Sequence, residues 1–156
     1  MGIGRKFHVA LGCGVVLALL APNAGALFVV NQPWVLPAAR GQSTEVYMNL
    51  TCTDGATLVA VRTNVSAAAT IVGPGKVTYP VGSLRLPAGT VVALGPGKTR
   101  VAFTRLVRSI KLGDRVELTL TIEGADGTRQ DIPVHAEVRR RSPLDDEKRA
   151  HHTHAH

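Results

Sequence analysis

The sequence predicts an all-β protein, built as a two-sheet β-sandwich or a Greek-key barrel. Short apolar runs recur from Leu27 to about Val138, and turn sequences rich in Gly, Pro and Asp separate them. No stretch of this region has the apolar spacing of an amphipathic helix. In "RVELTLTIE", at residues 115–123, apolar and polar residues alternate strictly, which is typical of a strand with one buried face.

The first 26 residues have the three parts of a cleavable signal peptide. Arg5 and Lys6 supply the positive charge, residues 9–20 form an apolar run, and residues 24–26 (Ala-Gly-Ala) supply the small residues of a cleavage site. An apolar run of about 12 residues spans only about 18 Å as a helix, against a bilayer core of about 30 Å. We therefore expect cleavage after Ala26 and a periplasmic or secreted product.

Cys13 offers an alternative, because a lipoprotein is anchored through a cysteine near its amino terminus. This cysteine lies inside the apolar run, and Ala10 stands where the lipoprotein signal usually has Leu. Lipid attachment is therefore not expected, and the mature protein is predicted to have no membrane anchor.

One domain, residues 27–138, is expected to hold the strands. The "GPGK" sequences at 73–76 and 95–98 are interpreted as turns, because no helix follows either of them as it would in a phosphate-binding loop. Cys52 is the one cysteine left after signal cleavage, and a small buried filler is its expected role. Strands are predicted at residues 27–31, 44–52, 57–63, 69–72, 76–81, 90–94, 99–105, 115–123 and 130–138.

The charge does not indicate a nucleic-acid partner. Lys and Arg number 18 against 11 Asp and Glu, for a formal charge of +7. Part of this excess lies in the signal and in Arg139–Arg141, and no basic stripe interleaved with aromatic residues is present.

Four segments carry a family resemblance: "VVNQPWVLPA", "VYMNLTCTDGATLVAVRT", "LRLPAGTVVALGPGKTRVAFTRL" and "IKLGDRVELTLTIEGADG". In order and spacing they resemble the periplasmic copper(A) chaperone family, PCu(A)C, over about residues 29–137. The resemblance implies a cupredoxin-like or immunoglobulin-like sandwich. It also implies Cu(I) held near the surface, for delivery to a copper-accepting protein such as a cytochrome oxidase subunit.

The resemblance places the family's copper ligands on four residues that cannot serve as soft ligands. Cu(I) prefers thioether and imidazole groups. The first His position falls on Val72, and the Met position falls on Thr78 or, if the strand slips, on Lys76. The His-x-Met pair falls on Arg100 and Ala102, so the usual core site is expected to be missing. Met48, in "VYMNL", is interpreted as a core residue.

Residues 139–156 are expected to form a disordered, charged, His-rich tail. The last six residues contain four histidines, which can bind Cu(II), Ni(II) or Zn(II) without a folded scaffold, with copper favoured by intrinsic affinity. The alternative is a solvated tail that only aids solubility. The predicted metal ligands are His151, His152, His154 and His156.

No spacing of Ser, His, Asp or Cys suggests an enzyme. Asp54 and Asp114 are expected in turns, and His135 is expected to be a packed or surface residue. The sequence thus predicts an exported copper-binding or copper-chaperone-like protein, with Cu(I) or Cu(II) as its metal. The alternative is a sandwich that has lost its metal site and serves as a binding or assembly module.

Overall fold

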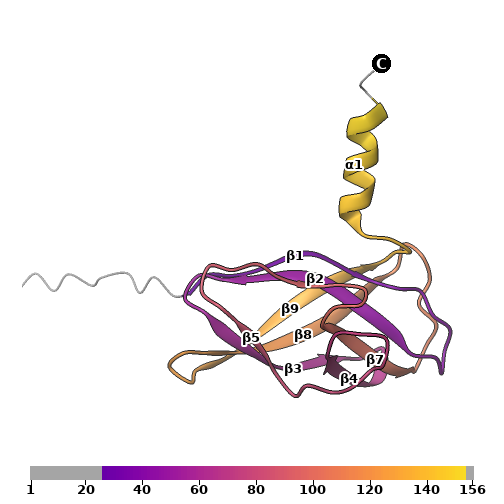
Figure 1. The fold of residues 1–156 in the computed structure, drawn as a ribbon. Helices are drawn as coiled ribbons and strands as arrows, with labels where there is room; N and C mark the ends of the chain where they lie inside the picture. The colour runs from indigo at the N-terminus through magenta and orange to yellow at the C-terminus, as the bar shows by residue number, and fades with distance from the viewer. Residues whose placement is uncertain (1–25, 154–156) are drawn as a thin grey trace, which may run out of the picture.

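The computed structural model describes residues 26–153, which form nine strands and one helix (Figure 1). The predicted signal peptide, apart from Ala26, lies outside the described residues. Within residues 26–153, no helix has the length and apolar content needed to cross a membrane. The elements are β1 (Phe28–Val35), β2 (Thr44–Cys52), β3 (Ala56–Thr63), β4 (Ser66–Val72), β5 (Leu84–Leu86), β6 (Val92–Leu94), β7 (Arg100–Leu106), β8 (Arg115–Gly124), β9 (Arg129–Val138) and α1 (Pro143–Thr153).

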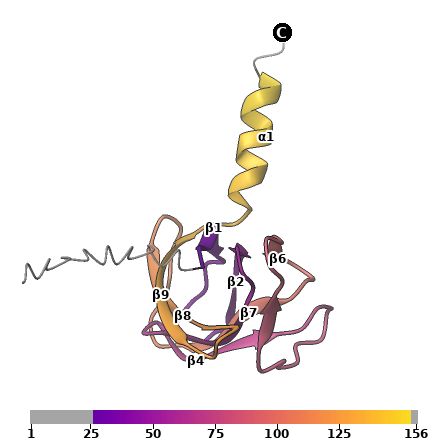
Figure 2. The same ribbon diagram turned by 90° about the vertical axis from the view of Figure 1, so that its left-hand side faces the viewer.

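The strands form one strongly curved sheet that nearly closes into a barrel. Its order is β4-β7-β2-β1-β9-β8-β3-β5, and β6 pairs with β2 beside this path. All neighbours are antiparallel except β1 and β9, which run parallel. Figure 2 views the sheet nearly end-on, with β9, β8, β4, β7 and β2 curving around a common interior. The all-β prediction is confirmed.

The interior is filled by one face of each long strand. In β8, Val116, Leu118, Leu120 and Ile122 are buried, as their alternation predicts, and in β9 the buried residues are Val134, Ala136 and Val138. Phe103 is the largest fully buried side chain. The core roles predicted for Met48 and Cys52 are confirmed, since both are almost fully buried.

One predicted strand, 76–81, is wrong. The segment is a loop in which Pro80 forms an isolated bridge with Val72, and Val77 and Tyr79 are exposed. It cannot continue as a ladder because Pro80 has no N–H to donate. The strand Leu84–Leu86 was missed, because three residues between Gly-Ser and Pro-Ala-Gly give too short an apolar pattern.

The expectation of a disordered tail is wrong over Pro143–Thr153, which is α1. Ser142 precedes the helix and its Oγ accepts a hydrogen bond from the N–H of Leu144 at 3.3 Å. Pro143 stands at the first helical position, and Asp145 and Asp146 lie in the first turn, where the helix dipole favours acidic residues. Arg139 joins the helix to β9 through Asp146, at 2.7 Å, and Figure 1 shows α1 leading away from the sheet.

Candidate functional site

The structure gathers three of the four residues that the resemblance placed at the copper site. Val72 ends β4 and Arg100 begins β7, and the two are partners across the ladder. Thr78, in the loop after β4, lies 3.5 Å from Nη2 of Arg100 through its Oγ1. Ala102 lies two residues farther along β7, opposite Thr70. The group at the centre of this arrangement is a guanidinium.

The guanidinium of Arg100 is buried, at 4% relative exposure, and donates to several partners. Its Nε lies 2.6 Å from Oε1 of Glu45 on β2, which makes an ion pair. Its Nη1 donates to the carbonyl oxygens of Gly73, at 3.0 Å, and Lys98, at 3.1 Å. These carbonyls belong to the two "GPGK" turns, which are also joined directly by the N–H of Gly75 and the carbonyl of Gly97, at 3.0 Å.

Glu45 links Arg100 to a buried aromatic pair. The hydroxyl of Tyr47 donates to Oε2 of Glu45 at 2.5 Å, and the Tyr47 ring lies against Trp34 with ring centroids 4.6 Å apart. Burial raises the pKa of Tyr47 well above its usual value, and the hydrogen bond to Glu45 and the charge of Glu45 act in the same direction. The positive charge of Arg100 opposes this rise only in part. Tyr47 is therefore a neutral donor.

These residues do not fit a Cu(I) ion. Arg100 carries a permanent positive charge and has no lone pair to offer, so it repels a metal cation. The two sulfur atoms of the described residues, in Met48 and Cys52, are buried in the core. Among residues 26–153, no three His, Cys, Asp or Glu side chains are grouped so that they could hold a metal. The side chain of Arg100 and its partners thus occupy the position where the resemblance placed the copper ligands. We call Arg100, Glu45, Tyr47 and Thr78 together the Arg100 network.

The predicted metal ligands lie at the end of the chain. His151 and His152 belong to the last part of α1, which ends at Thr153. His154 and His156 lie outside the described residues. The helix therefore carries the start of the His cluster away from the sheet, and metal binding by the four residues stays a prediction.

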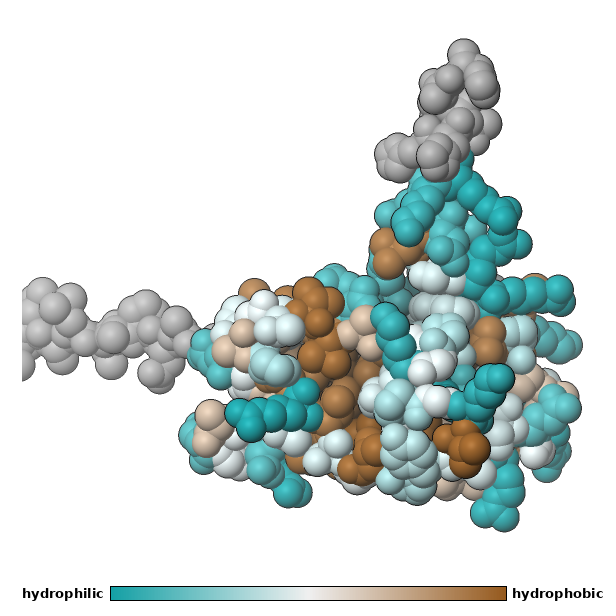
Figure 3. Space-filling view, in the orientation of Figure 1, coloured by the Kyte–Doolittle hydropathy of each residue, from teal (hydrophilic) through white to brown (hydrophobic). Residues whose placement is uncertain are grey.

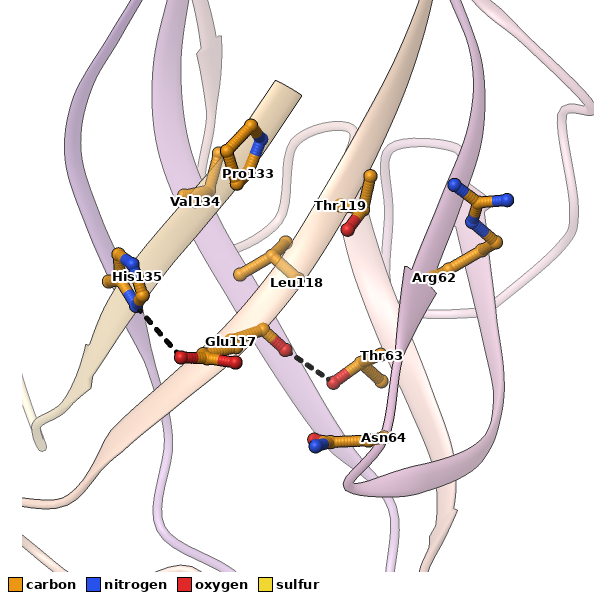
Figure 4. A pocket seen from close by; sticks show the side chains of 9 residues that line it. All are labelled: Arg62, Thr63, Asn64, Glu117, Leu118, Thr119, Pro133, Val134 and His135. Carbon is orange, nitrogen blue, oxygen red and sulfur yellow. Dashed lines mark hydrogen bonds and ion pairs between the residues drawn. The ribbon is translucent and has the colours of Figure 1, made fainter. Parts of the chain in front are cut away.

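A shallow hollow of about 440 Å³ on the outer face of β3, β8 and β9 is the other candidate (Figure 4). His135 lies here, with its Nδ1 3.7 Å from Oε1 of Glu117, and it is exposed, as expected of a surface residue. Arg62, at the rim, pairs with Asp131. The hydrogen bonds from Thr121 and Arg62 lower the pKa of Asp131. These groups satisfy one another on an open surface, and nothing in the hollow points to a ligand.

Comparisons with known proteins agree on the fold. The family model described as "Putative lipoprotein LpqE-like" matches residues 28–134, which is more than half of the chain. A comparison with curated proteins finds no match.

Three solved structures are similar over most of their length. The apo PCuAC domain from PmoF1 is 25% identical with a TM-score of 0.60, covering 72% of this chain and 92% of that domain. The Cu(I)-loaded DR1885 protein from Deinococcus radiodurans is 25% identical with a TM-score of 0.58, covering 76% of this chain and 83% of that one. The copper-bound PCuAC domain from PmoF2 is 18% identical with a TM-score of 0.59, covering 72% and 92%.

These likenesses confirm the resemblance read from the four sequence segments. The PmoF2 domain and the DR1885 protein each contain copper, which agrees with the absence of an enzyme motif in the sequence. The chain belongs to the LpqE-like family and has the fold of the PCuAC copper-chaperone domains.

Proposed function

We propose that the protein handles copper outside the cytoplasm, in the manner of a copper chaperone, and binds the metal through His151, His152, His154 and His156. The likeness to PCuAC domains, two of them copper-loaded, supports the copper-handling role. The observation that carries the placement of the metal is the burial of Arg100 where the family's ligands are expected. Four of the six histidines of the chain lie in its last six residues.

The four histidines at the end of the chain could bind a metal and release it to another protein. Imidazole binds Cu(II) and Cu(I), and a short His-rich segment at the end of a helix can supply several imidazole ligands to either ion. Because α1 leads away from the sheet, a bound ion is held at a distance from the positive charge of Arg100. A copper-accepting protein, such as a cytochrome oxidase subunit, is the partner that this role requires.

Replacing His151, His152, His154 and His156 with Ala in the full-length protein is expected to weaken Cu(II) binding by at least about 100-fold, because the imidazole donors are lost. Binding by the unaltered protein is expected to fall between about pH 7.5 and about pH 5.5, because imidazole must lose its proton to bind a metal. Competition with a chelator of known affinity measures both effects.

His135→Ala is the matched control, since it removes one exposed histidine from the sheet and should leave Cu(II) affinity unchanged. Thermal unfolding of the metal-free protein should be the same in all three proteins, because the tail contributes few contacts to the core. Unchanged Cu(II) affinity in the four-Ala protein would place the metal elsewhere and refute the proposal.

We propose that the signal peptide directs export and is then cleaved after Ala26, so the mature chain is expected to begin at Leu27. The intact mass of the protein recovered from an exporting host measures this directly. A product that retains residues 1–26, or one that begins at a lipid-modified Cys13 as the family description would allow, contradicts it.

The Arg100 network favours a second function, that of a binding or assembly module without metal. Arg100 forms an ion pair with Glu45 and hydrogen bonds with both "GPGK" turns. These contacts make a rigid surface rather than an open metal site. This function is supported instead if neither the unaltered protein nor the four-Ala protein binds copper.

A further inference from the structure

The loop after β4 exposes three apolar side chains at alternate positions. Between them lies Thr78, which is also exposed and whose Oγ1 is 3.5 Å from Nη2 of Arg100. Its neighbours Val77 and Tyr79 are 77% and 46% exposed, and Val81 is 37% exposed. Exposed apolar side chains that are close in sequence and face outward together mark a contact surface.

The segment is held in place rather than free to turn these side chains inward. The N–H of Gly73 donates to the carbonyl of Tyr79 at 2.9 Å, and the N–H of Val81 donates to the carbonyl of Ile71 at 3.0 Å. The Tyr79 ring lies directly over Gly73, where a Cβ atom would meet the ring carbons. A surface fixed in this way loses little conformational entropy when a partner binds.

The loop also joins the two end strands of the sheet, β4 and β5. Figure 3 shows apolar side chains gathered on this face between the positions of β5 and β4 in Figure 1. The exposed residues of the loop therefore lie at the border where the barrel is not closed by strand pairing.

The charge around these residues is positive. Lys76 and Lys98 stand in the two "GPGK" turns, which the Gly75–Gly97 hydrogen bond holds side by side. Residues 73–83 and 95–99 contain no Asp or Glu. The nearby carboxylate of Glu45 is taken up by Arg100 and Tyr47. Neither lysine forms an ion pair with any of residues 26–153.

We propose that Val77, Tyr79 and Val81, flanked by Lys76 and Lys98, form a docking surface for a protein partner whose own surface has an apolar centre bordered by carboxylates. We call these five residues the 77–81 surface. An apolar centre with a charged rim is the usual arrangement of a protein interface, and the positive rim selects a partner of opposite charge. The proposal does not depend on metal binding by the tail.

The test uses the full-length protein in its producing host, with a photo-crosslinking amino acid in place of Val77. The control carries the same group in place of Val107, which is also exposed but lies beyond the opposite end of β7. The expected result is a crosslink to one identified protein from position 77 and not from position 107, at a partner peptide that contains Asp or Glu.

Charge reversal then distinguishes specific docking of an acidic partner from non-specific hydrophobic binding. With the purified pair, Lys76→Glu together with Lys98→Glu should weaken binding by about tenfold or more, because like charges would face one another across the interface. Lys76→Arg with Lys98→Arg should retain binding. Arg108→Glu with Lys111→Glu, which makes the same change in net charge beyond the other end of β7, should also retain it.

Other outcomes overturn the proposal. A crosslink from position 77 to a second copy of this chain would make the surface a dimer interface. Crosslinks to lipid, together with binding of the purified protein to phosphatidylglycerol vesicles, would make it a membrane-contact surface. The absence of any product specific to position 77, or equal binding by the two charge-reversed proteins, would show that no acidic partner docks there.

Discussion

Arg100→Ala is expected to lower the free energy of unfolding by about 3 kcal/mol, which corresponds to a fall of about 10 °C in Tm. The substitution removes the cation that pairs with Glu45. It also leaves the carbonyls of Gly73 and Lys98 without the donor that now reaches them. Groups left unsatisfied in a buried position cost more than the net gain of the bond itself. Denaturation by urea, followed by circular dichroism, measures the change.

Arg62→Ala is the matched control for this prediction. Arg62 also pairs with a carboxylate, that of Asp131, but the two side chains are 63% and 52% exposed, against 4% for Arg100. Ion pairs at the surface contribute about 0–1 kcal/mol, so the loss should be at most about 1 kcal/mol. Equal losses of unfolding free energy in the two variants would show that the buried Arg100 network stabilises the fold no more than a surface ion pair does.

Arg100→Lys separates charge from geometry. An ammonium group keeps the positive charge, but it lacks the planar set of donors with which the guanidinium reaches Glu45, Gly73 and Lys98. We therefore expect a stability between those of the unaltered protein and Arg100→Ala. A Lys variant as stable as the unaltered protein would mean that charge alone holds the two turns together.

Strands with strict alternation could be predicted well from the sequence. The pattern of residues 115–123 defines both the strand and its buried face, because each apolar residue of β8 packs into the single core. The loop 76–81 could not be predicted in the same way. Its apolar residues alternate like those of a strand, but they are exposed, and Pro80 forms only an isolated bridge with Val72 of β4.

The Arg100 network could be predicted only in part. Aligning the chain with the family placed Arg100 among the ligand positions, and the structure brings Val72 and Thr78 to it. Glu45 and Tyr47 were missed because they alternate with Val46 and Met48 along β2, a pattern typical of side chains on the face away from the core. Trp34 of the neighbouring β1 covers Tyr47, and this contact between distant segments leaves no signal in local alternation.

The helix α1 could have been predicted from local sequence signals, but its composition favoured disorder. A charged segment with little apolar content is typical of disorder. Ser142 before Pro143, followed by Asp145 and Asp146, is nevertheless a recognisable helix start, and those rules apply without any tertiary contact.

Alkaline pH is expected to destabilise the protein through Tyr47. The usual pKa of a tyrosine is 10.0, and burial with the Glu45 contact raises that of folded Tyr47 well above it. Above about pH 10 the unfolded chain therefore releases a proton that the folded protein keeps, so the unfolded state gains stability as pH rises. Below about pH 10 both states hold the proton, and this contribution to stability is fully present.

The expected effect is a loss of about 1.4 kcal/mol of unfolding free energy for each pH unit above about pH 10, until the pKa of the folded state is reached. Tyr47→Phe keeps the ring against Trp34 but has no proton to release, so its stability should fall less steeply by that amount. At neutral pH the same variant should be less stable by about 1 kcal/mol, because Glu45 loses a hydrogen-bond donor. Urea denaturation at intervals from about pH 9 to about pH 12 compares the two proteins across the range in which unfolded tyrosine ionises. The unaltered protein is the more stable at neutral pH but loses stability faster, so the two curves of unfolding free energy against pH should cross at alkaline pH. Curves that stay parallel would show that Tyr47 ionises equally in the folded and unfolded states.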